Sequence, residues 1–173
     1  YLMGHDKETG LCERIEKARG YPFVTAARAV TDYLNVLGAE RIGLVSPYPA
    51  SITKQSIGYW ESVGFSVAEV AGIFDDSSDF HPIYILQTES SMDALMSLKD
   101  KGIDAIVMLG TGMPTLQPIL NCANWNGPHV TSCMLSLSWR TMLYIDRKGA
   151  SLDDILAWSR GQDWWQRMRA HGL

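Results

Sequence analysis

The stretch "IDAIVMLGTGMPTL", Ile103 to Leu116, decides the fold of this chain. Its first half is a largely apolar run of the length of a buried strand. The two glycines around Thr111 then allow a sharp turn, and Pro114 suits the first turn of a helix through Leu120. A buried strand that turns directly into a helix is the unit from which covered parallel sheets are built. The stretch therefore predicts an α/β fold.

The same alternation continues on both sides of this stretch. Three further runs have the composition of short buried strands: "RIGLVS" at 41–46, "FSVAEVA" at 65–71 and "HVTS" at 129–132. Helical patterns separate them. Thr25, Ser51 and the Ser90/Asp93 pair stand where side chains cap helix N-termini, and "SLSWRTMLYI" follows the last strand as a further helix.

Strands that alternate with helices in this way predict a doubly wound, flavodoxin-like parallel sheet spanning about residues 41–132. Helical segments at both ends, before Arg41 and after Leu135, are left over. The C-terminal one carries Trp164 and Trp165, and we expect it to pack on a neighbouring lobe rather than on a membrane or a partner helix.

The composition narrows the classes of partner. The net charge is −4 and Lys and Arg form no cluster, which argues against nucleic acid and against an anionic membrane surface. No apolar run has the roughly 20 residues that span a bilayer. Three widely spaced cysteines, Cys12, Cys122 and Cys133, make a disulfide framework improbable and indicate a cytoplasmic protein. The oligomeric state is open, and a homo-oligomer is possible.

Ligands of open α/β sheets bind beyond the carboxyl ends of the strands. At one such end, Tyr48 stands between two prolines in a stiff turn and can present its hydroxyl as a donor. At another, Gly110, Thr111 and Gly112 can bring backbone N–H groups close to an anion, with the following helix end pointing at the same place. The alternative interpretations are a loop aromatic for Tyr48 and a plain tight turn for the glycines.

The anion at this loop is predicted to be a carboxylate. The loop lacks the Gly-Lys-Ser/Thr ending of a phosphate-binding loop and the third glycine of a dinucleotide fingerprint. The four histidines, His5, His81, His129 and His171, have no metal-ligand spacing and are interpreted as structural or exposed. The sulfur of Cys133 could face the same crevice because it follows the fourth strand, although burial in the core is the commoner fate of a cysteine.

With these residues in place, the sequence resembles the aspartate/glutamate racemase superfamily, in its branch of maleate cis-trans isomerases and arylmalonate decarboxylases. The matching segments are "RIGLVSPY", "SITKQSIGYWESVGFSV", "DAIVMLGTGMPTLQPI" and "GPHVTS", within residues 26–132. The resemblance implies two pseudo-symmetric lobes with the active site between them, a small carboxylate substrate, and neither metal nor organic cofactor. Residues 26–134 would form the C-terminal lobe, and 1–25 with 135–173 a remnant of the N-terminal lobe and C-terminal helices.

The resemblance also implies roles for single residues. Tyr48 matches the active-site tyrosine, Thr111 supplies a backbone N–H to the carboxylate, and Gly112, Met113 and Cys133 are expected near the substrate. Gly110 occupies the position of the second-lobe cysteine. The first-lobe cysteine is expected upstream of Tyr1, and the asparagine of the third loop falls near Asp79 or Phe80.

Three functions follow from this pattern. The first is a cofactor-independent enzyme resembling maleate isomerase, which acts at the carbon next to a carboxylate of a small acid. The second is an arylmalonate-type decarboxylase that uses a single cysteine. The third is a lobe that binds a carboxylate without catalysis, since Gly110 has no thiol.

Overall fold

The computed structural model describes residues 2–75, 82–162 and 164–170 of the chain. Its centre is a four-stranded sheet in the order β2-β1-β3-β4, with all three neighbouring pairs parallel. The predicted doubly wound α/β fold is therefore confirmed. The strands are β1 (Arg41–Ser46), β2 (Ser66–Gly72), β3 (Ala105–Met108) and β4 (His129–Ser132).

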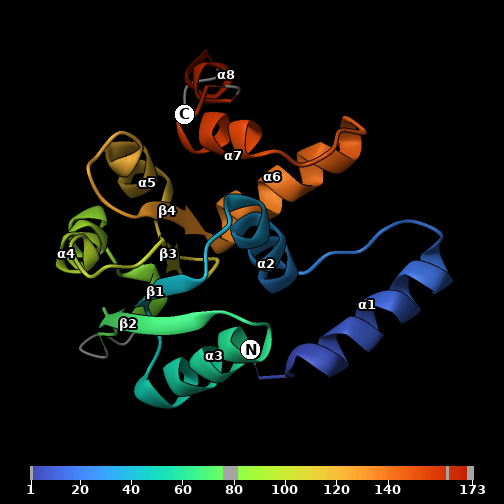
Figure 1. Cartoon of the computed structure of the whole chain (residues 1–173), viewed down its shortest axis with the longest axis horizontal. Helices are drawn as coiled ribbons and strands as arrows, with labels where there is room; N and C mark the ends of the chain where they lie inside the picture. Colours follow the sequence, from blue (N-terminus) through green and yellow to red (C-terminus); the bar gives the residue numbers. More distant parts are fainter. Residues whose placement is uncertain (1, 76–81, 163, 171–173) are drawn as a thin grey trace.

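Helices cover both faces of this sheet. The helices of the described residues, not all of which lie on the sheet, are α1 (His5–Arg19), α2 (Ala26–Leu37), α3 (Ala50–Ser62), η1 (Pro82–Tyr84), α4 (Thr88–Leu98), α5 (Leu116–Cys122), α6 (Cys133–Ile145), α7 (Leu152–Ser159) and α8 (Trp165–Ala170). In Figure 1, α4 and α5 lie on one side of the sheet and α2 on the other. None of the helices in the described part of the chain combines the length and the apolar character of a membrane span.

The two faces of the sheet carry separate cores because successive side chains of a strand point to opposite faces. One core packs Val45, Ile106 and Met108 against α4 and α5. The other packs Leu44 and Val107 against the helices of the opposite face, with Trp60 of α3 fully buried in it. Strands β1 and β3 are apolar on both sides because they lie in the middle of the sheet.

Three predicted helix starts are wrong, although the helices exist. Helix α3 begins at Ala50 after Pro49, so Ser51 lies inside its first turn and does not cap it. Helix α4 begins at Thr88, which places Ser90 and Asp93 inside the helix. Helix α5 begins only at Leu116 and has 7 residues, so Pro114 lies in the loop before it. The predicted cap at Thr25 is confirmed, since its side chain accepts a hydrogen bond from Arg28 N–H.

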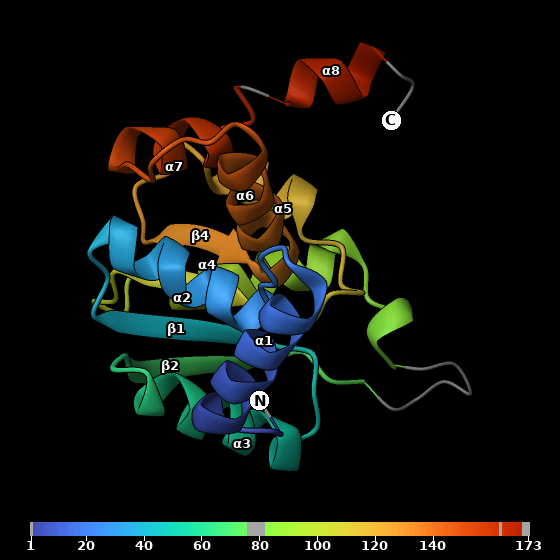
Figure 2. The same ribbon diagram turned by 90° about the vertical axis from the view of Figure 1, so that its right-hand side faces the viewer.

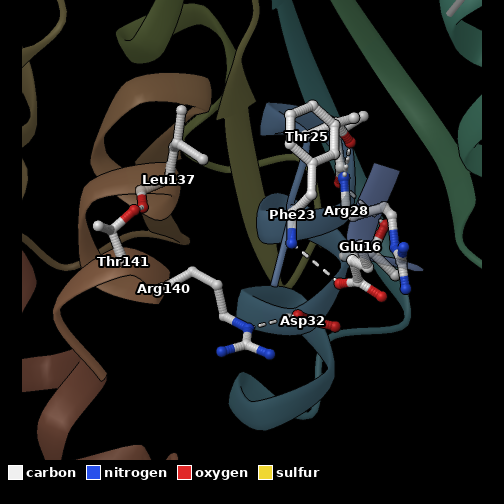
Figure 3. A network of polar contacts seen from close by, with 10 residues as sticks. Glu16, Phe23, Thr25, Arg28, Asp32, Leu137, Arg140 and Thr141 are labelled. Carbon is white, nitrogen blue, oxygen red and sulfur yellow. Dashed lines mark hydrogen bonds and ion pairs between the residues drawn. The ribbon is translucent and has the colours of Figure 1, made fainter. Parts of the chain in front are cut away.

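The helix after β4 packs on α2. Tyr33 and Trp139 meet edge to face with ring centroids 5.1 Å apart. Arg140 also donates to Asp32 over 2.8 Å, and Figure 3 shows this ion pair between the two helices. The division into 26–134 and the end segments stays a prediction, but α6 lies on the same lobe as α2.

Helix α1 lies at the outside of the lobe: it stands apart from the sheet in Figure 1 and in front of it in Figure 2. Its Glu8 carboxylate accepts hydrogen bonds from the hydroxyls of Thr25 and Tyr59, at 2.5 and 2.6 Å. Glu16 accepts one from the backbone N–H of Phe23 at 2.9 Å (Figure 3). Polar contacts therefore contribute to the attachment of this helix to the sheet layer.

Candidate functional site

The turn after β1 is fixed by two side-chain hydroxyl groups, a buried one on Ser46 and a partly buried one on Thr53. The Ser46 side chain is fully buried, and its Oγ lies 2.7 Å from Thr53 Oγ1. Ser46 Oγ also accepts a hydrogen bond from the Tyr48 N–H at 3.4 Å, and Thr53 Oγ1 donates to the Tyr48 carbonyl at 3.1 Å. The backbone of Tyr48 is thus held from both sides, which orients its half-buried ring at the carboxyl end of the sheet.

Gly110 lies opposite this tyrosine, at the end of β3. Its φ of +89° is in the region that favours glycine. A Cβ atom added to Gly110 would lie 3.4 Å from Tyr48 Oη and 3.0 Å from Pro47 Cγ. The ends of β1 and β3 therefore approach so closely that the Tyr48 hydroxyl faces the backbone of Gly110.

The loop after Gly110 offers backbone donors. Thr111 and Gly112 are exposed. Within the described part of the chain, no backbone carbonyl accepts a hydrogen bond from the N–H groups of Gly110, Thr111 or Gly112. Backbone N–H groups need a partner, and an anion at a glycine-rich loop supplies one. Together with the Tyr48 hydroxyl, these groups form a candidate carboxylate site.

The end of β4 closes the third side of this site. Thr115 Oγ1 donates to Ser132 Oγ at 3.0 Å, and both side chains are buried. Ser132 in turn caps α6 by accepting from the Leu135 N–H. The hydrogen bond between Thr115 and Ser132 therefore connects the loop after β3 to the start of α6.

Cys133 is the first residue of α6 and is only 4% exposed. It belongs to the core against which Tyr48 packs. Burial raises the pKa of Tyr48, and the neighbouring Cys133 thiol raises it further when charged. Tyr48 is therefore protonated at neutral pH and can donate a hydrogen bond to an anion.

The structure brings together most of the predicted site. Tyr48 and Gly110 are adjacent, and Thr111 and Gly112 continue the same loop. The side chain of Met113, by contrast, is 5% exposed and packs in the core under α4 and α5, so its substrate-binding role remains a prediction that only its backbone could fulfil. Asp79 and Phe80, the predicted third-loop positions, lie outside the described residues.

Four residues near the site were missed by the sequence analysis. Thr115 and Ser132 carried a signal, since both are hydroxyl residues in segments that follow or end strands. Ile83 and Tyr84 carried none: they belong to η1, and only the fold places them over the glycine loop. A Cβ at Gly112 would lie 2.9 Å from Tyr84 Cε1.

The two described histidines, His5 and His129, lie on α1 and at the start of β4 and are not part of this candidate site. His129 begins β4 and so lies at the amino end of the parallel strands, away from the candidate site at their carboxyl ends. Its Nε2 lies 3.0 Å from Tyr33 Oη. Burial lowers its pKa to about 4, which keeps it neutral. His81 and His171 lie outside the described residues. Among the residues that the structure describes, no group of three His, Cys, Asp or Glu could hold a metal ion.

Comparisons with known proteins agree with this architecture. The maleate isomerase of Alcaligenes faecalis is 25% identical in an alignment of 116 residues that covers 60% of this chain and 45% of the relative. The maleate isomerase of Nocardia farcinica is 26% identical over 105 residues, 60% of this chain and 41% of the relative. The chain thus spans less than half the length of these relatives.

Solved structures share the fold. A variant of the maleate isomerase Iso from Pseudomonas putida, crystallised with maleate, matches with a TM-score of 0.73 and 25% identity, over 83% of this chain and 59% of that one. Arylmalonate decarboxylase matches with a TM-score of 0.72 and 18% identity, over 80% of this chain and 61% of that one. A family model described as arylmalonate decarboxylase matches residues 1–151. The chain therefore belongs to the arylmalonate decarboxylase family.

Proposed function

We propose that this chain carries the carboxylate-binding lobe of a cofactor-independent enzyme of the maleate isomerase type. The observation that carries the proposal is the approach of Tyr48 Oη to Gly110, 3.4 Å from the position of a Cβ, beside a loop whose N–H groups donate to no backbone carbonyl of the described residues. The substrate would be a small mono- or dicarboxylic acid, with one carboxylate on the N–H groups of Gly110 to Gly112. The three cysteines form no disulfide within the described part of the chain, which is compatible with a cytoplasmic protein.

The proposed chemistry is electrostatic. Donors aimed at an oxygen on which charge develops stabilise an enediolate or a carbanion next to the carboxylate. The Tyr48 hydroxyl and the loop N–H groups are such donors, and the buried hydroxyl contacts of Ser46 and Thr53 keep Tyr48 in place. The lobe would thus stabilise charge at the carboxylate, while the reacting carbon faces away from the loop.

The thiol for such a reaction does not come from Gly110. In the Nocardia farcinica maleate isomerase, a variant was crystallised with a covalently bound succinylcysteine intermediate. We propose that a cysteine of the first lobe, which the resemblance implies, forms the corresponding bond here. That step would add the thiolate to the double bond of maleate, allow rotation about the resulting single bond, and expel the thiolate again.

Decarboxylation of a substituted malonate is the second candidate, and one cavity favours it. A cavity of about 430 Å³ adjoins the site through Thr115 and Ser132. Apart from hydroxyls, its lining is apolar and sulfur-containing: Leu116, Met134, Leu135, Met142, Trp158, Trp164 and Met168. Cavities of this size and character hold apolar substituents. An aryl group could occupy it while a carboxylate binds at the loop.

The test compares variants of the whole protein on maleate and on arylmalonates. Tyr48→Phe removes one donor and is expected to lower kcat by about 100-fold, while Thr111→Ala, which removes only a hydroxyl, costs about tenfold. Tyr144→Phe is the matched control, because Tyr144 is 54% exposed near the end of α6. Proton NMR follows fumarate formation, and carbon dioxide release reports the second candidate.

The outcomes separate the candidates. Fumarate without carbon dioxide supports the isomerase, and carbon dioxide without isomerisation supports the decarboxylase. Saturable binding by calorimetry, with no product at any enzyme concentration, supports a lobe that only binds a carboxylate. Unchanged turnover in Tyr48→Phe and Thr111→Ala would contradict the proposed site.

A further inference from the structure

Helix α1 lies on the lobe with little apolar contact. Its buried residues are Glu8 and Cys12, whereas Leu11 and Ile15 are only partly buried. Helix α2, by comparison, buries an apolar face that includes Leu34. Because hydrophobic stabilisation scales with the apolar area removed from water, apolar packing alone fastens α1 weakly. The attachment of α1 therefore depends on its polar contacts.

The Glu8 carboxylate is held by the two neighbouring helices, α2 and α3. One carboxylate oxygen accepts a hydrogen bond from Thr25 Oγ1 at 2.5 Å, and the other accepts one from Tyr59 Oη at 2.6 Å. Thr25 is the N-cap of α2, so the carboxylate also lies near the positive end of that helix. Hydrogen bonds to an ionised acceptor are shorter and stronger than those between neutral groups.

The groups around Glu8 suit an anion. Tyr59 is only 4% exposed, and burial, followed by the neighbouring Glu8 carboxylate, raises its pKa, so its hydroxyl is protonated and can donate. The positive charge of Arg28 acts on the same hydroxyl. Figure 3 shows Arg28 at the start of α2, next to Thr25 and Glu16. Thr25, Tyr59 and Arg28 thus form a carboxylate-binding site, called the Glu8 site below, which α1 fills with its own side chain.

The connection after α1 allows this helix to move without disturbing the sheet. Helix α1 ends at Arg19, Gly20 has a φ of +73°, and residues 21–25 are neither helix nor strand. Strand β1 pairs with β2 and β3. The hydrophobic cores of the described residues include no residue of α1. Separation of α1 from the lobe would therefore break side-chain contacts and leave the ladders of the sheet in place.

We propose that α1 is a detachable strap and that Glu8 is its latch. The helix opens as a unit when its carboxylate leaves the Glu8 site, while the sheet and the helices α2 and α3 stay folded. In the absence of Glu8, the same site takes a small free carboxylate. This inference is independent of the proposed function, because it involves neither Tyr48 nor the Gly110–Gly112 loop.

Hydrogen–deuterium exchange of the whole protein, followed by mass spectrometry, tests the latch in Glu8→Ala. The amides of α1 should exchange about 10- to 100-fold faster than in the wild type, since hydrogen bonds to a charged group shift an opening equilibrium by that order. The amides of α2 and β1 should keep their wild-type rates. Glu13→Ala is the matched control: Glu13 is exposed on the same helix, and its loss should leave the exchange of α1 unchanged.

Acetate tests the Glu8 site itself. Glu8→Ala removes one methylene and the carboxyl group, which together have the size of acetate. A ligand that binds the closed form stabilises it, so acetate should slow the exchange of α1 in Glu8→Ala. Acetamide, which has the same shape and no charge, should have no such effect at equal ionic strength. In the double variant with Tyr59→Phe, which keeps the ring and loses one donor, the acetate effect should be weaker.

Several results would overturn the proposal. Equal α1 exchange in Glu8→Ala and Glu13→Ala would show that Glu8 is no latch. Faster exchange of α2 and β1 together with α1 would show that α1 does not open as a separate unit. Equal effects of acetate and acetamide would contradict a site for a carboxylate. Should Glu8→Ala fail to fold, Tyr59→Phe alone decides: faster exchange confined to α1 supports the latch, and unchanged exchange overturns it.

Discussion

Replacing Gly110 by alanine adds a single methyl group at the centre of the candidate site. Two separate costs follow from the geometry. The backbone at Gly110 has a φ of +89°, and a residue with a Cβ in the left-handed region costs about 1–2 kcal/mol. The new Cβ would also lie 2.7 Å from Ile83 Cδ1 and 3.0 Å from Pro47 Cγ, and overpacking a close-fitting interior costs about 1–3 kcal/mol.

The expected loss in the free energy of unfolding is therefore about 2–5 kcal/mol, a large part of the roughly 5–15 kcal/mol that keeps a domain folded. Urea unfolding followed by tryptophan fluorescence measures it, with Trp60 and Trp139 buried in the lobe as reporters. For a slope of about 2 kcal/mol per molar urea, the midpoint should fall by about 1–2.5 M.

Gly64→Ala separates the two costs. Gly64 has a φ of +99°, but no atom lies within 4 Å of its Cβ position, so only the backbone cost of about 1–2 kcal/mol applies. In an Ile83→Ala background, Gly110→Ala should become about 1–2 kcal/mol less costly, because the closest contact is gone. If Gly110→Ala destabilises no more than Gly64→Ala, and Ile83→Ala brings no relief, the close packing over Gly110 is refuted.

Two further predictions concern stability. The pKa of His129 is lowered from 6.5 to about 4, chiefly by burial and then by the charge of Arg160. Between these pH values the unfolded chain binds a proton that the folded protein excludes. The free energy of unfolding should therefore fall by up to about 3 kcal/mol as the pH falls from 6.5 to 4. Urea unfolding at pH 7 and 4.5 should show a smaller difference for His129→Asn than for the wild type, and equal differences would count against the buried neutral histidine. Thr115→Val loses the hydrogen bond to Ser132 and should lower the free energy of unfolding by about 1–2 kcal/mol, or Tm by a few degrees, whereas Thr115→Ser should keep most of this stability. If Thr115→Val has the Tm of the wild type, the hydrogen bond has no structural role.

Several features of the fold were predictable because they depend on local patterns. The apolar runs at 41–46 and 105–108 are strands since both faces of the central sheet are covered, and the cap at Thr25 follows from a side-chain oxygen that reaches the Arg28 N–H. Helix starts were less predictable. A serine near a helix start satisfies a capping pattern whether or not the helix begins there, and at α3 the chain already turns into the helix after Pro49.

The site shows the same division. That Tyr48 and the Gly110–Gly112 loop would lie close together could be predicted, because the carboxyl ends of neighbouring parallel strands meet at one end of the sheet, whereas their roles stay predictions. Cys133 could be placed at that end but not oriented, since the first residue of α6 could point into the crevice or into the core. The structure buries its side chain in the core beside Tyr48.

The sequence by itself determined the parallel α/β fold, the strand ends at which the candidate site lies and the absence of a thiol at Gly110. These properties reside in the order and spacing of residues along the chain. The tertiary structure alone decided that Ile83 fills the space over Gly110, that Thr115 is tied to Ser132, and that Met113 turns into the core. These are contacts between segments far apart in the sequence, and they arise only when helices close over the sheet and every buried side chain has to fit beside its neighbours.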